Sequence, residues 1–199
     1  MGADRRAGTG MPDYVSYLFS QEVIEEPGTR FHYSTGDSIL AGRMVEEASG
    51  MRLSEYLYRR IFAPMEMGFP IWENDPMGHP IGGGGMFLKL TDMMKLGQLY
   101  LAGGVWKGQR LVEESWIREA TKEQIKTDQD PQNPDIWRCG YGYQFWLSPY
   151  PDSYRADGAF GQITTVLPRA GLVVSIQCPE TGDFERVKQA LHESVLDKL

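Results

Sequence analysis

Residues 27–50 read PGTRFHYSTGDSILAGRMVEEASG. The Pro-Gly pair predicts a turn, and the partly aromatic run Thr29 to Tyr33 predicts a short extended segment. A helix is expected next, with three candidate capping residues at its start: Ser34, Thr35 and Asp37. Its apolar residues recur every four positions, at Leu40, Met44 and Ala48. Gly50 predicts the end of the helix, because glycine adopts the left-handed conformation at little cost. Tyr33 is therefore expected where an extended segment meets a helix N-terminus, rigidly held yet accessible.

The rest of the chain changes from helical to strand-like patterns. Further helices are predicted at about residues 12–19, 53–62, 91–102 and 112–121, and strands at 141–147, 154–160, 162–167 and 172–178. A closing helix from about Thr181 carries apolar residues on one face. Because the strand connections are short, we expect an antiparallel sheet. Helices precede and follow it, so the predicted class is α+β, with flanking helices and a separate helical layer.

Length and composition predict one domain. A chain of 199 residues, 41% hydrophobic and 24% charged, is long enough for a real core. We expect residues 1–10 to be a flexible arm and residues 11–199 a single domain. Residues 11–135 should be mainly helical, and residues 136–199 should hold the sheet and the closing helix. Cys139 and Cys178 lack a Cys-x-x-Cys spacing and are expected to be reduced, although a disulfide is compatible with the sequence.

Charge and hydropathy exclude several partners. The net charge of −7, with no basic stripe, argues against nucleic-acid binding. No apolar run is long enough to span a membrane, and the N-terminus lacks the apolar core of a secretory signal. We therefore expect a cytoplasmic protein, or a periplasmic one if an upstream segment is missing. His32, His79 and His192 are scattered, so no metal site and no cofactor are expected.

Two motifs together resemble a known family. The run PGTRFHYST, then a helix, then IFAPMEMG at residues 61–68, is similar to the serine β-lactamases and penicillin-binding-protein-like hydrolases, in particular the esterase and 6-aminohexanoate-dimer (nylon-oligomer) hydrolase type. The resemblance extends from about Tyr14 to the C-terminus. It implies a partial β-lactamase/transpeptidase-like fold and hydrolysis of small amides or esters.

The resembled hydrolases use three elements, and the first is absent from this sequence. A Ser-x-x-Lys at a helix start supplies the nucleophile and a lysine one helical turn away that helps to deprotonate it. None of the 11 serines is followed by lysine three positions on. In the family this element precedes the tyrosine loop. The chain thus resembles the C-terminal portion of such an enzyme, without the nucleophile helix.

The second element is Tyr33-Ser34-Thr35. By resemblance, Tyr33 would be the proton shuttle, and Ser34 and Thr35 would contact the substrate. Thr35 stands where the family often has asparagine, which removes an expected amide contact. The alternative interpretation is structural: Tyr33 fastens the start of the helix.

The third element is the run ADGAFGQ at residues 156–162. By resemblance, the N–H of Ala159 would be an oxyanion donor, and Gly158 would let the substrate approach the backbone. Asp157 is a substrate-binding candidate that would repel a carboxylate if it faced the cleft, which favours a neutral or amine-bearing amide or ester. The alternative is a tight strand crossing that needs glycine. Gly84 and Gly85 would form a cleft wall by resemblance, or a plain turn on physical grounds alone.

The leading hypothesis is a β-lactamase-like serine hydrolase of amidase or esterase type, inactive alone. It is expected to bind a small-molecule amide or ester and to need a complementing N-terminal segment. The alternatives are a non-catalytic small-ligand-binding module and a self-associating module. The hydrolase hypothesis requires Tyr33 and Gly158 to face one hollow.

Overall fold

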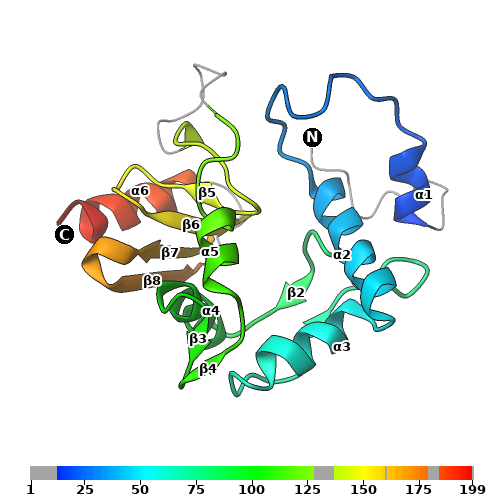
Figure 1. Ribbon diagram of the computed structural model, residues 1–199. Coiled ribbons are helices and arrows are strands. Elements are labelled where there is room, and N and C mark those ends of the chain that lie inside the picture. The colour runs from blue at the N-terminus through cyan, green and yellow to red at the C-terminus, as the bar shows by residue number, and fades with distance from the viewer. Residues whose placement is uncertain (1–12, 128–136, 160, 179–183, 199) are drawn as a thin grey trace. The chain divides into compact units, whose positions relative to one another are not determined.

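The computed structural model describes residues 13–127, 137–159, 161–178 and 184–198 (Figure 1). The chain divides into two compact units, Met1–Leu88 and Lys89–Leu199. The boundary at Leu88 lies well before residue 135, where the sequence changes to strand-like patterns. The arm expected at residues 1–10 lies outside the described residues.

The first unit begins with two capped helices. Helix α1 (Tyr14–Phe19) is capped by the Asp13 carboxylate, which accepts hydrogen bonds from two backbone N–H groups of the first turn. Helix α2 (Thr35–Ser49) has Ser34 as its N-cap and ends at Gly50, whose φ is 68°. The predicted start and end of this helix are confirmed. The extended run predicted before it is a loop without strand pairing.

A second helical stretch widens before it ends. Helix α3 (Leu53–Leu57) continues into the π-helical turn η1 (Tyr58–Phe62), where the N–H of Ala63 donates to the carbonyl of Tyr58. Pro64 follows and has no N–H to extend the ladder. The chain then forms a two-stranded antiparallel ribbon of β1 (Ile71–Trp72) and β2 (Met86–Phe87). Among its described residues, the buried apolar side chains include Leu53, Phe62, Met65, Met67 and Ile81.

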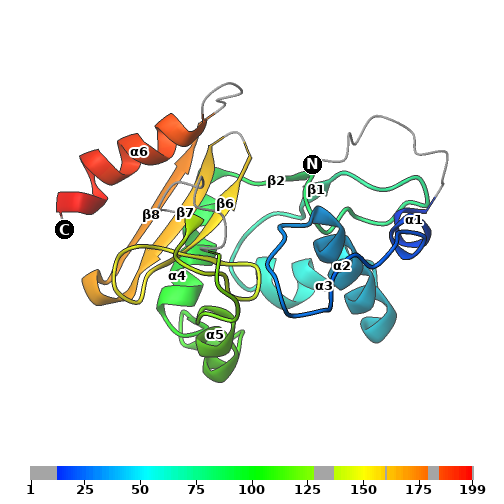
Figure 2. The same ribbon diagram turned by 90° about the horizontal axis from the view of Figure 1, so that it is seen from above.

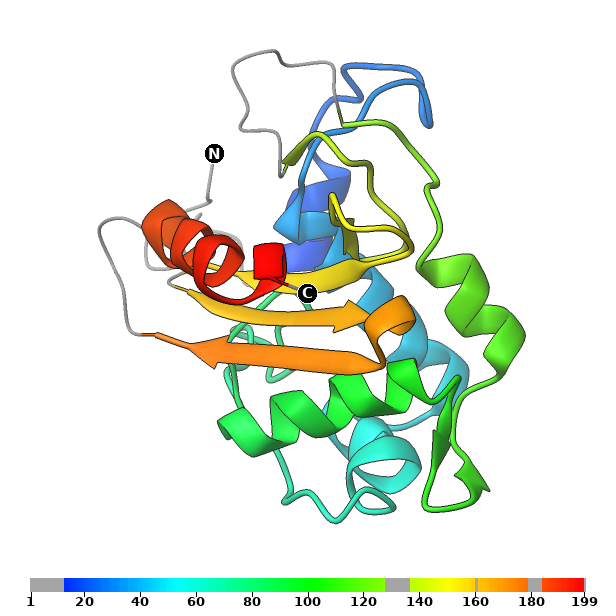
Figure 3. The same cartoon turned by 90° about the vertical axis from the view of Figure 1, so that its left-hand side faces the viewer.

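The second unit is a four-stranded antiparallel sheet between helices. The strands β5 (Trp146–Leu147), β6 (Tyr154–Gly158), β7 (Gln162–Leu167) and β8 (Leu172–Gln177) lie in that order. Helix α4 (Leu90–Leu101) covers one face, and α6 (Phe184–Ser194) covers the other (Figures 2 and 3). The antiparallel sheet and the α+β class are confirmed.

Smaller elements complete the second unit. They are β3 (Val105–Trp106), β4 (Gln109–Arg110), α5 (Glu114–Ala120), η3 (Pro168–Ala170) and η4 (Leu196–Lys198). The strand predicted at 141–147 is shortened to two residues, because Gln144 turns the chain with a φ of 66°. The apolar run at 172–178 is typical of a buried strand, yet β8 is only half-buried because it lies at the edge of the sheet.

Alternation along β7 places the core on both faces of the sheet. Ile163 and Leu167 pack against Leu191 of α6 and Leu196 of η4. On the other face α4 comes so close that a methyl group at Gly97 would lie 2.5 Å from Val173 and 2.8 Å from Thr164. Within the described residues, every helix is too short or too polar to span a bilayer.

Candidate functional site

The tyrosine loop keeps its predicted place at a helix N-terminus. The Ser34 hydroxyl accepts a hydrogen bond of 3.4 Å from the N–H of Asp37, and Thr35 is the first helical residue. The side chain of Tyr33, directly before the cap, is 61% exposed. Tyr33 is thus largely exposed to solvent, while the backbone that carries it leads directly into a capped helix.

A glycine-rich loop lies flat on the first turns of α2. A methyl group built at Gly82 would lie 2.3 Å from the carbonyl oxygen of Ser38, and one at Gly83 would overlap Thr35. Only residues without a side chain permit such close contact. The structure therefore brings Ser34 and Thr35 into the same unit and the same neighbourhood as the loop.

Trp72 holds the two ends of this loop through hydrogen bonds from its indole N–H. Its indole N–H donates to the carbonyl oxygens of Ile81 (2.9 Å) and Gly84 (2.8 Å). Gly85 has a φ of 73°, and its carbonyl accepts a hydrogen bond from the N–H of Glu73. Gly84 and Gly85 are therefore parts of an ordered turn, and the role of that turn as a cleft wall stays a prediction.

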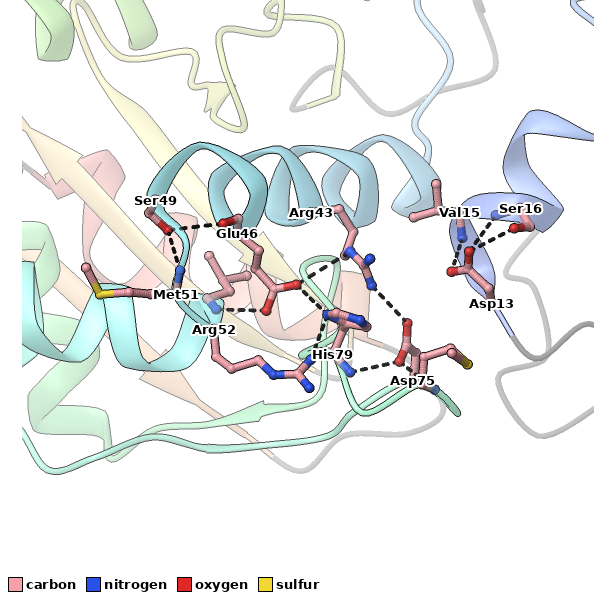
Figure 4. Close-up of polar contacts among 12 residues, drawn as sticks. Asp13, Val15, Ser16, Arg43, Glu46, Ser49, Met51, Arg52, Asp75 and His79 are labelled. Atoms are coloured by element: carbon pink, nitrogen blue, oxygen red, sulfur yellow. Dashed lines mark hydrogen bonds and ion pairs between the residues drawn. The ribbon is translucent and has the colours of Figure 1, made fainter.

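A buried carboxylate ties the base of the loop to α2 (Figure 4). Glu46 is 8% exposed and accepts a hydrogen bond from the N–H of Leu53, and its other oxygen lies 2.6 Å from Nδ1 of His79. Asp75 accepts the N–H of His79, and Arg43 lies between the carboxylates of Glu46 and Asp75. Glu46 lies on the side of α2 opposite the apolar positions Leu40, Met44 and Ala48, so the apolar pattern did not reveal this cluster.

The third predicted element lies at the end of β6 in the second unit. Gly158 is the last strand residue and pairs with Gln162 of β7, and Ala159 follows in an exposed turn. A methyl group at Gly158 would meet only atoms of Gln162, the nearest being its side-chain oxygen, whereas Gly161 needs its positive φ of 81°. The tight turn thus depends on Gly161, and the role of Gly158 as an open approach to the backbone stays a prediction.

Asp157 does not present an unpaired charge. Its carboxylate is 3% exposed and lies 3.1 Å from Nε of Arg155 and 3.5 Å from Nζ of Lys188. Burial raises the pKa of Asp157, and the two cations oppose this rise. The expected repulsion of a substrate carboxylate depended on Asp157 facing a cleft. Within its own unit, this charge is instead directed towards two cations.

Two signals in the sequence could have revealed this buried cluster. Arg155 and Asp157 have opposite charges at i and i+2 of a strand, so they share a face. Lys188 precedes Leu191 by three positions, on the helix face that packs on the sheet. Trp137 lies beside both cations, with its ring centre 3.5 Å from Nζ of Lys188.

A second polar group joins the strand layer to the C-terminal residues. The hydroxyl of Tyr150 donates to Asp197 (2.6 Å) and lies 2.8 Å from Nδ1 of His192. Burial and the Asp197 charge raise the pKa of Tyr150, and burial lowers the pKa of His192. Among the described residues there is no cluster of three or more His, Cys, Asp or Glu side chains that could hold a metal ion, and both cysteines are free thiols.

Comparison with known proteins identifies the family. The family described as Beta-lactamase matches residues 2–195, nearly the whole chain. The chain belongs to the Beta-lactamase family. Among the relatives of this family member, 6-aminohexanoate-dimer hydrolase of Paenarthrobacter ureafaciens is 26% identical over 165 residues, which cover 69% of this chain and 41% of that protein.

Solved structures of Beta-lactamase-like proteins share the fold. A putative 6-aminohexanoate-dimer hydrolase from Bacillus anthracis has a TM-score of 0.78 at 19% identity, and covers 94% of this chain and 49% of its own. A penicillin-binding-protein homologue from Caulobacter crescentus has a TM-score of 0.75 at 15% identity, with 94% and 63% covered. This member of the Beta-lactamase family thus spans about half the length of the relatives it matches.

The candidate site residues fall into two groups, one in each unit. The structure brings Ser34, Thr35 and the glycine loop together in the first unit. Gly158 and Ala159 lie beside the buried charge cluster in the second unit. The approach of Tyr33 to Gly158, on which the hydrolase hypothesis depends, stays a prediction.

Proposed function

We propose that this chain is the part of an amide- or ester-hydrolysing enzyme that carries the tyrosine loop and the oxyanion strand, and that it does not hydrolyse substrate alone. One observation carries the proposal: a chain of the Beta-lactamase family contains no serine followed by lysine three positions on. A hydroxyl is a weak nucleophile unless a base lies within hydrogen-bonding reach. A second polypeptide segment must therefore supply Ser-x-x-Lys.

The remaining residues have distinct roles in this proposal. Tyr33 carries the proton between the nucleophile and the leaving group, and the N–H of Ala159 stabilises the oxyanion. Ser34, Thr35, Gly84 and Gly85 contact the substrate beside Tyr33, and Gly158 lines the approach to Ala159. The Asp157 side chain is buried against two cations, so it supports the strand end and does not contact the substrate. The exposure of the Tyr33 ring and the tight docking of the glycine loop on α2 support this assignment. The matched relative, a 6-aminohexanoate-dimer hydrolase, makes a linear amide the first substrate to test.

The test compares the chain alone with the chain fused at its N-terminus to a Ser-x-x-Lys segment from a family member. Alone, the chain should hydrolyse p-nitrophenyl acetate at the buffer rate and should not react with a serine-directed fluorophosphonate. The fusion should hydrolyse the ester, and Tyr33→Phe in the fusion should lower kcat by a factor of roughly 10²–10⁴. A fusion with alanine in place of the nucleophilic serine is the control.

Two results contradict the proposal. Saturable hydrolysis by the chain alone would show that its own residues suffice, and loss of that activity in Ser34→Ala would identify Ser34 as the nucleophile. A folded fusion that stays inactive towards both ester and linear amide would leave the chain as a non-catalytic binding module.

A second candidate is self-association, and the edge of the sheet favours it. Within the described residues β8 pairs only with β7, and its six residues, LVVSIQ, include no charge and no proline. Natural proteins usually blunt such an edge with charge, proline or a bulge. The opposite edge strand, β5, has two residues. A second copy is the occupant we propose, because antiparallel pairing of β8 with itself sets uncharged residues opposite one another.

Light scattering tests this candidate. We expect a concentration-dependent dimer that Leu172→Lys weakens, because Leu172 is at the exposed start of β8. Trp116→Lys, at another exposed apolar position, should leave the dimer unchanged. A monomer at every concentration, or an equal effect of both substitutions, would contradict the β8 pairing.

A further inference from the structure

Three charged side chains are almost wholly buried between β6 and α6. Arg155 and Lys188 are each 2% exposed, and the side chain of Asp157 is 3% exposed. Removing charges from water is costly, and buried ion pairs often stabilise a fold no better than apolar residues of the same volume. This cluster is therefore a weak source of stability, and the question is which part of the backbone it holds in place.

The cluster anchors the last side chain before the proposed oxyanion donor. Asp157 is followed by Gly158, which has no side chain, and then by Ala159 in an exposed turn. After Asp157, the path of the backbone is set by the pairing of Gly158 with Gln162 and by the positive φ of Gly161. The carboxylate of Asp157 is thus the nearest buried side-chain anchor on the N-terminal side of the Ala159 N–H.

That anchor is held from two directions. Arg155 approaches along the strand, with its Nε 3.1 Å from the Asp157 carboxylate, and its Nη1 also donates to the carbonyl of Leu147 on β5. Lys188 approaches from α6, with its ammonium 3.5 Å from the same carboxylate and above the ring of Trp137. The end of β6 is therefore tied to a neighbouring strand and to the helix that covers the sheet. Sites built on such rigid supports keep their geometry.

We propose that Lys188 and Arg155 are positioning residues, which hold the Asp157 carboxylate and thereby fix the orientation of the Ala159 N–H. This inference rests on the proposed function for the oxyanion role of Ala159. The rigidity of the turn at Ala159 does not depend on catalysis, so it can be measured on the chain alone. Lys188 acts through Asp157 and is itself only 2% exposed, so it does not touch the substrate.

The first test is made on the chain alone by nuclear magnetic resonance. Lys188→Met keeps an unbranched side chain of nearly the same length and removes its charge. We expect the backbone order parameter of Ala159 to fall from about 0.85, typical of rigid backbone, to below about 0.6. The order parameter of Leu172, at the opposite end of the sheet, should not change. Lys188→Arg should restore the rigid value, and Gln189→Met, on the exposed side of the same helix, is the matched control.

The second test uses the fusion that carries Ser-x-x-Lys. Lys188→Met should lower kcat by a factor of roughly 10 to 10², with KM changed less than about threefold, because a misplaced donor affects the transition state more than substrate binding. Lys188→Arg should recover most of kcat. A purely structural role would predict fewer folded molecules with an unchanged kcat per folded molecule.

The two tests separate the possible failures. If Ala159 stays rigid in Lys188→Met, or if every amide loosens equally, the positioning role is wrong. If Ala159 loosens but the parent fusion has no activity, the positioning inference stands and the proposed function fails. Should Lys188→Met not fold, Asp157→Asn removes the charge that both cations hold. The same selective loosening of Ala159 is then expected, and a rigid Ala159 would overturn the inference.

Discussion

Replacement of Gly82 by alanine should detach the glycine loop from α2. The new methyl carbon would lie 2.3 Å from the carbonyl oxygen of Ser38 and 3.4 Å from Cα of Gly42. Carbon and oxygen approach no closer than about 3.3 Å, so the loop would have to move by about 1 Å. The obstructing atoms are backbone on both sides, so no side chain can rotate out of the way. Overpacking of this kind typically costs about 1–3 kcal/mol, and the upper half of that range is expected.

Urea unfolding measures this cost. With a slope of about 2 kcal/mol per M, a loss of about 2 kcal/mol lowers the midpoint by about 1 M. Gly68→Ala is the matched control, because the first unit also contains Gly68 and no atom lies within 4 Å of the position of its new methyl group. Its midpoint should stay the same or rise slightly, since alanine reduces the entropy of the unfolded chain.

Trp72 provides a local readout, because its indole N–H is bonded to two carbonyls of the same loop. Hydrogen exchange in residues 81–88 should speed up in Gly82→Ala and not in Gly68→Ala. Equal midpoints for the two variants, or slower exchange of the loop in Gly82→Ala, would refute the close packing described for α2.

Three further outcomes follow from single contacts. Gly97→Ala should lower the free energy of unfolding by about 1–2 kcal/mol, because the new methyl group would press on Val173. In a double-mutant cycle, Val173→Ala should relieve that loss. Additive effects of the two substitutions would show that the residues are not in contact. Ser34→Ala should lower the free energy of unfolding, measured in urea, by about 0.5–1 kcal/mol, because it removes the capping oxygen of α2. Ser34→Asp keeps a capping oxygen and should lower it less. Equal losses for the two variants would show that the cap is not responsible. Burial lowers the pKa of His192 below 6.5, so the unfolded chain binds a proton that the folded chain does not, and stability should fall as the pH drops below 6.5. His192→Gln should show a smaller fall in urea midpoint over that range, and an identical pH profile would contradict the sign of this shift.

Local signals made part of the fold predictable. The N-cap at Ser34, the stop at Gly50 and the short turns between strands each depend on a few neighbouring residues. A helix N-terminus beside Tyr33 could therefore be predicted, and so could an antiparallel sheet. The family resemblance then supplied the candidate roles of the site residues.

Contacts between distant residues were not predictable in the same way. Nothing near Gly82 in the sequence shows that it will lie against Ser38, because the contact depends on how the loop folds back onto α2. The ion pair of Asp157 with Lys188 joins residues 31 positions apart. In both cases tertiary packing decides the outcome, and a single sequence carries only a weak trace of it.

The C-terminal residues belong to the folded body of the second unit. Leu196 is 2% exposed in the α6-facing core, and Asp197 accepts the hydroxyl of Tyr150. Chain ends are often frayed and tolerate trimming or extension. Here, shortening the chain after Val195 would open a hole in the core and leave the Tyr150 hydroxyl without its acceptor. An affinity tag or a reporter that displaces Leu196 or Asp197 should therefore destabilise the second unit.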